Sequence, residues 1–162
     1  MVARVLHEQL GAFMGERFRE PTEENPQGYW EDLDFKECNA AFLTGQVPFE
    51  KWSVIISELA ERRSTLHTNW GLKDPRLCYL LGLYLSIIDD PVIVRCNRDA
   101  EKVAPSMTKN YGWPIEAARR TCFDRSARLD KLLKGRKVHS MDFTETRTDE
   151  EVEQWLSKIL FQ

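Results

Sequence analysis

Residues that could bind an anion occur at fixed spacing just after an apolar stretch in the middle of the chain. The stretch reads VIVRCNRDAEKVAPS, and Ser106 lies eight residues after Arg98. The pattern predicts a short strand, a tight turn and a helix, with Arg98 where the strand ends. Ligands of open α/β sheets bind beyond the carboxyl ends of strands, where helix N-termini, arginine forks and hydroxyl groups suit phosphate. We therefore predict an anion site that contains Arg98 and Ser106.

The same segment, R-D-x-E-x-V-x-x-S after a hydrophobic strand, resembles the 3′-phosphate-binding segment of sulfotransferases. These enzymes transfer a sulfuryl group from 3′-phosphoadenosine 5′-phosphosulfate (PAPS) to a hydroxyl or an amine. The resemblance implies that Arg98 and Ser106 bind the 3′-phosphate of PAPS. Two residues depart from the family pattern. Ala100 stands where the family usually has proline, and Pro105 would remove a hydrogen bond from the helix and kink its axis.

A second segment, KDPR, begins at Lys73, which is the last residue of another predicted strand, residues 70–73. Many sulfotransferases have a lysine at the equivalent strand end, which implies that Lys73 neutralises charge on the bridging oxygen as the sulfuryl group leaves. Cytosolic members have a histidine two residues later, but Pro75 stands there in this chain, so a histidine base at this position is excluded. The alternative is a surface turn with a solvated lysine.

A third segment, NPQGYWED, follows a helix whose end reads LGAFMGE. This combination is similar to bacterial and phage-type sulfotransferases, some of which use a glutamate here as the general base. The resemblance implies that Glu31 takes the proton of the acceptor hydroxyl, with Asp32 and Asp74 as further candidates. The alternative is that Tyr29 and Trp30 anchor the loop while Glu31 caps the following helix.

Hydrophobic periodicity and turn residues predict an α/β fold that has more helix than strand. Strands that alternate with helices imply a P-loop-like parallel sheet flanked by helices. A capping box, TDEE from Thr148, predicts the start of the last helix. The predicted helices are 2–15, 35–43, 49–62, 77–88, one from about 100, 114–133 and one from 149, and the predicted strands are 70–73, a strand from 92, and 137–143.

The family's Gly-rich loop for the 5′-phosphosulfate, roughly P-R-S-G-T-[ST], does not occur in this sequence. The first residues, MVARVL, resemble the helix that follows this loop, so the chain is expected to be truncated at its N-terminus relative to the family. The absent strand is normally central, which would leave exposed sheet edges and favour a homo-oligomer that forms through them.

Composition places further bounds on the chain. Its 162 residues with a net charge of −3 predict a single domain, 1–162, and argue against nucleic acid as a partner. No apolar run is long enough for a membrane span, and no metal-ligand pattern occurs. Four scattered cysteines favour a reduced, cytoplasmic setting, with Cys96 a small buried strand residue. Four arginines of one predicted helix form either a solvated face or further phosphate contacts: Arg119, Arg120, Arg125 and Arg128.

Three functions follow as hypotheses. The first is a sulfotransferase-like enzyme that uses PAPS as its co-substrate, an unidentified hydroxyl compound as the acceptor, and no metal. The second is a catalytically inactive remnant or binding module with the same fold, because the phosphate loop is absent. The third is a P-loop nucleotide kinase, which would need a loop lysine and a Mg²⁺-binding Ser or Thr.

Overall fold

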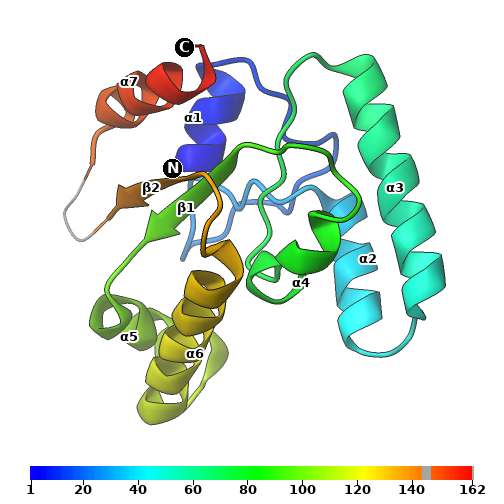
Figure 1. Ribbon diagram of the computed structural model, residues 1–162. Helices are drawn as coiled ribbons and strands as arrows, with labels where there is room; N and C mark the ends of the chain where they lie inside the picture. The colour runs from blue at the N-terminus through cyan, green and yellow to red at the C-terminus, as the bar shows by residue number, and fades with distance from the viewer. Residues whose placement is uncertain (144–146, 162) are drawn as a thin grey trace.

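The computed structural model describes residues 1–143 and 147–161, which form an α/β arrangement rich in helix (Figure 1). The elements are α1 (Val2–Glu8), α2 (Leu33–Leu43), α3 (Phe49–Leu66), α4 (Leu77–Tyr84), β1 (Ile93–Asn97), α5 (Ala100–Tyr111), α6 (Ile115–Leu133), β2 (Val138–Asp142) and α7 (Asp149–Leu160).

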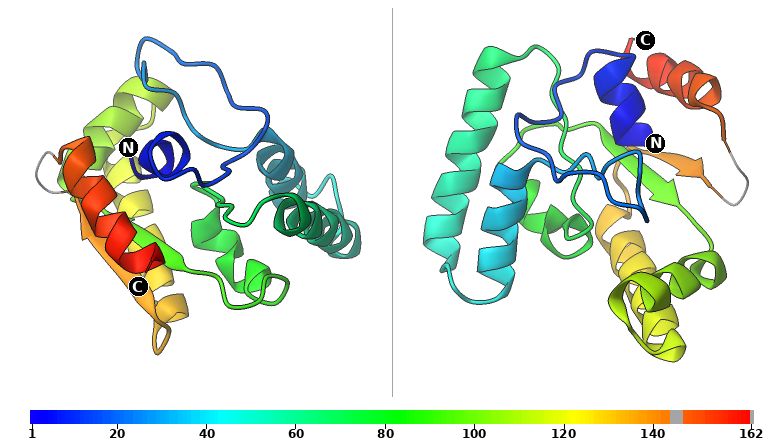
Figure 2. Two further views of the ribbon diagram at one scale, coloured as in Figure 1. Left: turned by 90° about the horizontal axis from the view of Figure 1, so that it is seen from above. Right: turned by 180° about the vertical axis from the view of Figure 1, so that it is seen from behind.

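The sheet consists of β1 and β2, which run parallel with Ile93 opposite Val138 and Asn97 opposite Asp142. The two strands are joined by α5 and α6, as expected of a parallel pair that needs a helical crossover. Helices α1 and α7 pack on one face of the sheet, and α5 and α6 lie on the other side (Figure 2). The α/β class and the parallel pairing are therefore confirmed, for a sheet of two strands.

Side chains of β1 contact both helical layers. Val94 packs against the apolar cluster that holds α1 and α7 to the sheet. Its neighbour Arg95 points to the opposite face, where it forms an ion pair with Asp130 and donates to Ser126 of α6 at 2.9 Å. This alternation is the two-residue period of a strand whose two faces are both covered.

The buried apolar side chains of the described residues form three separate clusters. The first joins α2, α3 and α4, the second joins α1, the sheet and α7, and the third joins α5 and α6. A small domain usually has one contiguous core, whereas the core of this fold is divided among three groups of elements. The fully buried members of the first two clusters include Trp52, Ile56, Val5, Val152 and Leu156.

Several sequence predictions need correction. The first helix ends at Glu8 rather than near residue 15, because Gly11 and Gly15 adopt positive φ angles of 67° and 140° that leave the helical region. Residues 70–73 do not form a strand, since they contribute one isolated parallel bridge between Phe13 and Trp70. Cys96 is exposed rather than buried.

Other boundaries agree closely with the sequence pattern. The capping box is confirmed, since Thr148 Oγ1 accepts from the backbone N–H of Glu151, and Glu151 accepts from the backbone N–H of Thr148. Helix α5 runs from Ala100 to Tyr111 with Pro105 inside it, and it ends at Gly112 in a left-handed conformation. None of the described helices is both long enough and apolar enough to cross a membrane.

Candidate functional site

The loop that precedes α2 directs Glu31 into the protein. Trp30 has a φ angle of 53°, a conformation that is rare for residues other than glycine, and it turns the chain just before Glu31. The indole of Trp30 donates to the carbonyl of Gln27 at 2.7 Å, which holds this turn in place. Asp32 follows as the N-cap of α2, because its carboxylate accepts from the backbone N–H of Asp34 at 3.0 Å. The helix cap is thus Asp32 rather than Glu31.

Glu31 is 5% exposed and binds two ammonium groups. Its Oε1 lies 2.6 Å from Lys73 Nζ, and its Oε2 lies 2.6 Å from Lys36 Nζ. Burial by itself would raise the pKa of Glu31, but the hydrogen bonds from Lys36 and Lys73 outweigh it and hold the pKa below its usual value. The carboxylate is therefore ionised, as a base must be, although its lowered pKa makes it a weak base while both lysines remain bound.

Lys73 joins two segments that are far apart in the sequence. Besides Glu31, from which it is separated by 42 residues, its ammonium donates to the carbonyl oxygen of Tyr29 at 3.1 Å. The side chain of Lys73 is 41% exposed, so solvent and ligands can reach it. The prediction of a surface turn with a merely solvated lysine is therefore wrong, because Lys73 has two specific partners.

A buried hydrogen-bond network fixes the segment next to Lys73. Asn39, which is 0% exposed, donates to Asp74 at 3.0 Å and accepts from Trp52 at 3.1 Å and from Tyr84 at 2.9 Å. Asp74 in turn accepts from the backbone and the guanidinium of Arg76. Side chains of α3 and α4 and the carboxylate of Asp74 thereby meet at one amide of α2, which positions Asp74 and the adjacent Lys73.

Ser106 lines a cavity of about 270 Å³ together with residues of the NPQGYWED loop and of the segment just before it. Its hydroxyl accepts a long hydrogen bond of 3.5 Å from Asn110, one turn further along α5. The remaining lining residues are polar or aromatic and include two tyrosines: Arg19, Glu24, Asn25, Tyr29 and Tyr111. The cavity is thus walled by α5 on one side and by the loop before α2 on the other.

Tyr29 connects this cavity to the acid–lysine contact. Its ring lies under the guanidinium of Arg19 at 4.2 Å, its hydroxyl lies 2.9 Å from Thr22, and its carbonyl accepts from Lys73. Two of the residues predicted from the sequence, Glu31 and Lys73, therefore touch one another. A third, Ser106, lies across a cavity that shares Tyr29 with them.

Arg98 is exposed at the carboxyl end of β1, immediately before Asp99, the N-cap of α5. It is not among the residues that line the Ser106 cavity. Asp99 accepts from the backbone N–H of Glu101 at 2.9 Å, which starts the helix directly after the strand. The described part of the structure records no side-chain contact of Arg98. Arg98 is therefore free to approach an anion at the N-terminus of α5 without losing an internal partner.

Three of the four arginines of α6 are used in packing. Arg119 forms ion pairs with Glu101 at 2.8 Å and Glu116 at 2.6 Å. The guanidinium groups of Arg125 and Arg128 lie over the ring of Tyr79, 5.6 and 5.2 Å from its centroid. These contacts join α6 to α5 and α4, and they disfavour the hypothesis that these side chains bind nucleotide phosphates.

Lys36 and Asn39 are the members of the site that sequence reasoning missed. Lys36 lies in the first turns of α2, and helical side chains tilt toward the N-terminus of their helix, so it reaches back to Glu31. Because Lys36 follows the Asp32 cap closely, the sequence could have shown that its side chain lies near the loop that contains Glu31. Asn39 gave none, because its partners come from α3, from α4 and from the segment that precedes α4.

No family model, no curated protein and no solved structure matches this chain. Among residues 1–143 and 147–161, no group of three or more His, Cys, Asp or Glu side chains could hold a metal ion. The site must therefore be interpreted from its own chemistry: a buried glutamate held by two lysines beside a polar cavity.

Proposed function

We propose that this chain is a sulfotransferase-like protein that transfers a sulfuryl group from PAPS to an acceptor hydroxyl. The observation that carries the proposal is the 2.6 Å contact between Glu31 and Lys73, two residues that the family resemblance singled out independently. The proposal gains support from Ser106, because its cavity shares Tyr29 with that contact.

In the proposed reaction, Arg98 and Ser106 bind the 3′-phosphate of the donor. The acceptor oxygen attacks sulfur, the bond between sulfur and the bridging phosphate oxygen breaks, and adenosine 3′,5′-bisphosphate leaves. Lys73 neutralises the negative charge that develops on that bridging oxygen. The proton of the acceptor hydroxyl passes to Glu31, so all atoms and charges are accounted for.

Lys73 would link donor binding to the basicity of Glu31. While Lys73 binds Glu31, its hydrogen bond helps to keep the pKa of the carboxyl low. A donor phosphate competes with Glu31 for the same ammonium. When Lys73 turns to the donor, Glu31 keeps only Lys36, its Oε1 becomes free to accept a proton, and its pKa rises toward the ordinary value. The base is thereby activated only when the donor is present.

A non-catalytic anion-binding module with the same fold is the second candidate. The observation that favours it is that both oxygens of Glu31 are bound by ammonium groups at 2.6 Å, which is also what a purely structural ion-pair cluster requires. The two candidates differ in turnover: the module would bind the nucleotide and release it unchanged.

The test is a titration of the purified chain with adenosine 3′,5′-bisphosphate, with AMP and ATP–Mg²⁺ as competitors. We expect selective binding of the 3′-phosphorylated nucleotide, and a loss of about tenfold or more in affinity for Arg98→Ala, as for a lost charged phosphate contact. Arg120→Ala is the matched control, because Arg120 is an exposed arginine elsewhere on α6.

Equal binding of AMP, or an unchanged affinity in Arg98→Ala, would contradict the assignment of the 3′-phosphate site. A preference for ATP with Mg²⁺ would favour the kinase hypothesis instead. If the bisphosphate binds selectively, incubation with PAPS and a panel of hydroxyl acceptors separates the enzyme from the binding module.

A further inference from the structure

The cavity beside Ser106 contains a cation that lies outside the segments that resemble sulfotransferases. Arg19 and Ser106 both line this cavity, Arg19 from the chain before α2 and Ser106 from α5. Seen from behind, the chain before α2 descends beside the sheet toward α5 (Figure 2). Among the described residues that line the cavity, Arg19 is the only lysine or arginine, and Arg98 is not one of them. An anion that Ser106 binds inside the cavity therefore has Arg19 as its nearest available cation.

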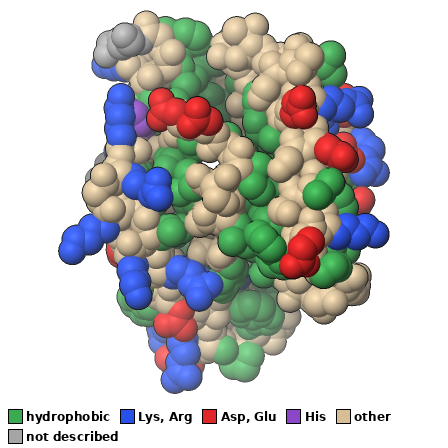
Figure 3. Space-filling view, turned by 45° about the vertical axis from the view of Figure 1, so that its right-hand side comes forward, with side chains coloured by type: hydrophobic (Ala, Val, Ile, Leu, Met, Phe, Trp, Pro, Cys, Tyr) green, Lys and Arg blue, Asp and Glu red, His purple; other side chains and the backbone are tan. Residues whose placement is uncertain are grey.

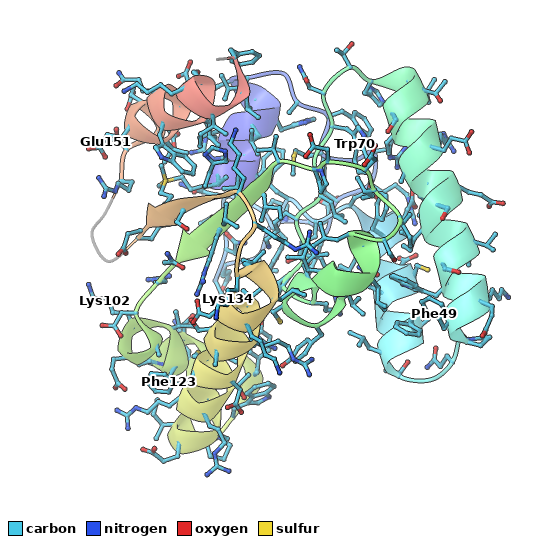
Figure 4. All side chains as sticks on the ribbon, in the orientation of Figure 1. Phe49, Trp70, Lys102, Phe123, Lys134 and Glu151 are labelled. Carbon is cyan, nitrogen blue, oxygen red and sulfur yellow. The ribbon has the colours of Figure 1, made fainter. Side chains whose placement is uncertain are left out.

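Cations are common on the surface of this protein, so the position of Arg19 matters more than its charge. Figure 3 shows Lys and Arg side chains spread over the visible face, with Asp and Glu side chains among them. Lys102, in the first turn of α5, lies at the outer edge of the molecule (Figure 4) and does not line the cavity. Arg19 differs from these surface cations because it borders a cavity that also contains a hydroxyl group.

The ring of Tyr29 holds Arg19 and leaves its hydrogen-bond donors available. The Arg19 guanidinium lies over this ring, 4.2 Å from the centroid, and the Tyr29 hydroxyl is itself fixed 2.9 Å from Thr22 Oγ1. A guanidinium that rests on an aromatic face keeps the N–H groups at its edge free to donate. Within the described part of the chain, no ion pair joins Arg19 to an acidic side chain, not even to Glu24 of the same cavity. A phosphate can therefore bind this fork without displacing an internal partner.

The α5 wall of the cavity offers neutral donors to the same phosphate. Ser106 Oγ accepts a long hydrogen bond of 3.5 Å from Asn110, which leaves the hydroxyl proton of Ser106 able to point into the cavity. The cavity, at about 270 Å³, is slightly smaller than the roughly 300–1,000 Å³ of most small-molecule sites. It therefore suits a phosphate together with its sugar rather than a whole nucleotide.

We propose that Arg19 binds the 3′-phosphate of the donor, which enters the cavity and bonds to the Arg19 fork and to Ser106. This inference rests on the proposed function and adds a specificity-determining residue to it. The carboxylate of Glu24 disfavours a second anionic group in the cavity, which fixes the orientation of the donor. The 5′ end of the donor consequently lies outside the cavity, toward Lys73, whose ammonium donates to the carbonyl of Tyr29 at 3.1 Å.

Isothermal titration calorimetry with adenosine 3′,5′-bisphosphate tests the role of Arg19. Arg19→Gln should weaken binding about tenfold or more, as for a lost charged phosphate contact. Glu24→Gln should strengthen binding roughly twofold to fivefold, because a like charge leaves the cavity. Both residues are exposed, so the fold should tolerate these changes. Arg17→Gln is the matched control, because it removes the same charge two residues away from a side chain that pairs with Asp34 and Glu37 and does not line the cavity.

Tyr29 is a positioning residue in this arrangement, and two substitutions separate that role from a general structural one. Tyr29→Phe keeps the ring under Arg19 and loses only the contact with Thr22, so the affinity for the bisphosphate should change by less than about twofold. Tyr29→Leu removes the ring and should weaken binding about threefold to tenfold. Circular dichroism verifies that each variant is folded. Equal affinities of the two variants would contradict the positioning role.

The outcomes distinguish this inference from the proposed function. Selective binding of the bisphosphate that Arg98→Ala weakens and Arg19→Gln does not would overturn the role of Arg19 and leave the proposed function standing. An affinity that Glu24→Gln lowers or leaves unchanged would place the phosphate outside the cavity and overturn the inference as well. Equal binding of AMP and the bisphosphate, both weakened by Arg19→Gln, would keep Arg19 as a phosphate-binding residue and overturn the proposed function. Failure of the unmodified chain to bind the bisphosphate would overturn both.

Discussion

The two halves of the candidate site differ in how firmly the chain itself holds them. On the acid–lysine side, Glu31, Asp32, Asp74 and Asn39 are all buried and hydrogen-bonded, with exposed fractions between 0 and 6%. On the phosphate side, by contrast, Arg98 and Ser106 are exposed at the end of β1 and on α5. One half is preorganised by buried hydrogen bonds, whereas the other half is exposed and has few internal contacts.

This difference predicts which variants should change the stability of the protein and which should change only its affinity for a ligand. Groups that are buried together are costly to disturb, because each lost partner leaves another polar group unsatisfied. Exposed groups without internal partners can be changed at little cost to the fold, and their effect should be on binding alone. Removing a hydrogen-bonding partner on the acid–lysine side should therefore lower the free energy of unfolding, whereas variants on the phosphate side should only weaken ligand affinity.

The largest effect is expected for Arg63→Ala. Arg63 is 1% exposed and forms ion pairs with Asp32 at 3.0 Å and Asp34 at 3.1 Å, next to the N-terminus of α2. Its removal leaves a buried carboxylate uncompensated, so urea denaturation should show a loss of about 3–5 kcal/mol in the free energy of unfolding. Arg62→Ala is the control, because Arg62 is 59% exposed and its loss should cost less than about 0.5 kcal/mol. A larger loss would contradict the distinction between buried and exposed groups.

A smaller loss is expected for Asn39→Ala. The substitution leaves the Trp52 and Tyr84 donors and one oxygen of Asp74 without a partner, so the free energy of unfolding should fall by about 2–3 kcal/mol. Thermal and urea unfolding measure this. Asn110→Ala, on the phosphate side, should change stability by less than about 0.5 kcal/mol. Equal losses for the two variants would mean that the two sides do not differ as described.

The smallest effect concerns the pH dependence of stability. The pKa of Glu31 is lowered in the folded protein, so its contribution is fully present above the unfolded value, near 4.5. That contribution is lost as the pH falls through the lower folded pKa. Glu31→Gln should therefore flatten the decline of stability below about pH 5 and leave its slope near pH 7 unchanged. Urea unfolding from pH 3 to pH 7 measures this, and an unaltered acid limb would contradict it.

Local signals in the sequence sufficed for much of the fold. The pattern from Pro114 predicted a helix that the structure has at Ile115–Leu133, and the capping box at Thr148 predicted the start of α7. The parallel pairing of β1 with β2 followed from the alternation of strands and helices. The helix and the capping box are determined by residues close together in the sequence, and the pairing follows from the order of strands and helices along the chain, which is why these predictions succeeded.

The failures concern elements that depend on distant partners. Residues 70–73 have a strand-like composition, but a strand needs a continuous ladder, and Phe13 supplies only one bridge. Periodicity continued past Glu8, yet the glycines that follow turn the chain away to meet Asn69. In the site, the residue types of Glu31 and Lys73 were found from the sequence, whereas their direct contact and its reinforcement by Lys36 were not, because these are tertiary features.

The measurement that tests the central claim most directly is the affinity of Glu31→Gln for adenosine 3′,5′-bisphosphate. If the two halves form one site, the nucleotide competes with Glu31 for Lys73, and neutralising Glu31 releases that ammonium for the ligand. An ion pair of about 1 kcal/mol would then appear as a roughly fivefold gain in affinity over the unmodified chain. An unchanged or weaker affinity, in a variant that remains folded, would show that Lys73 does not serve the nucleotide and would contradict the account.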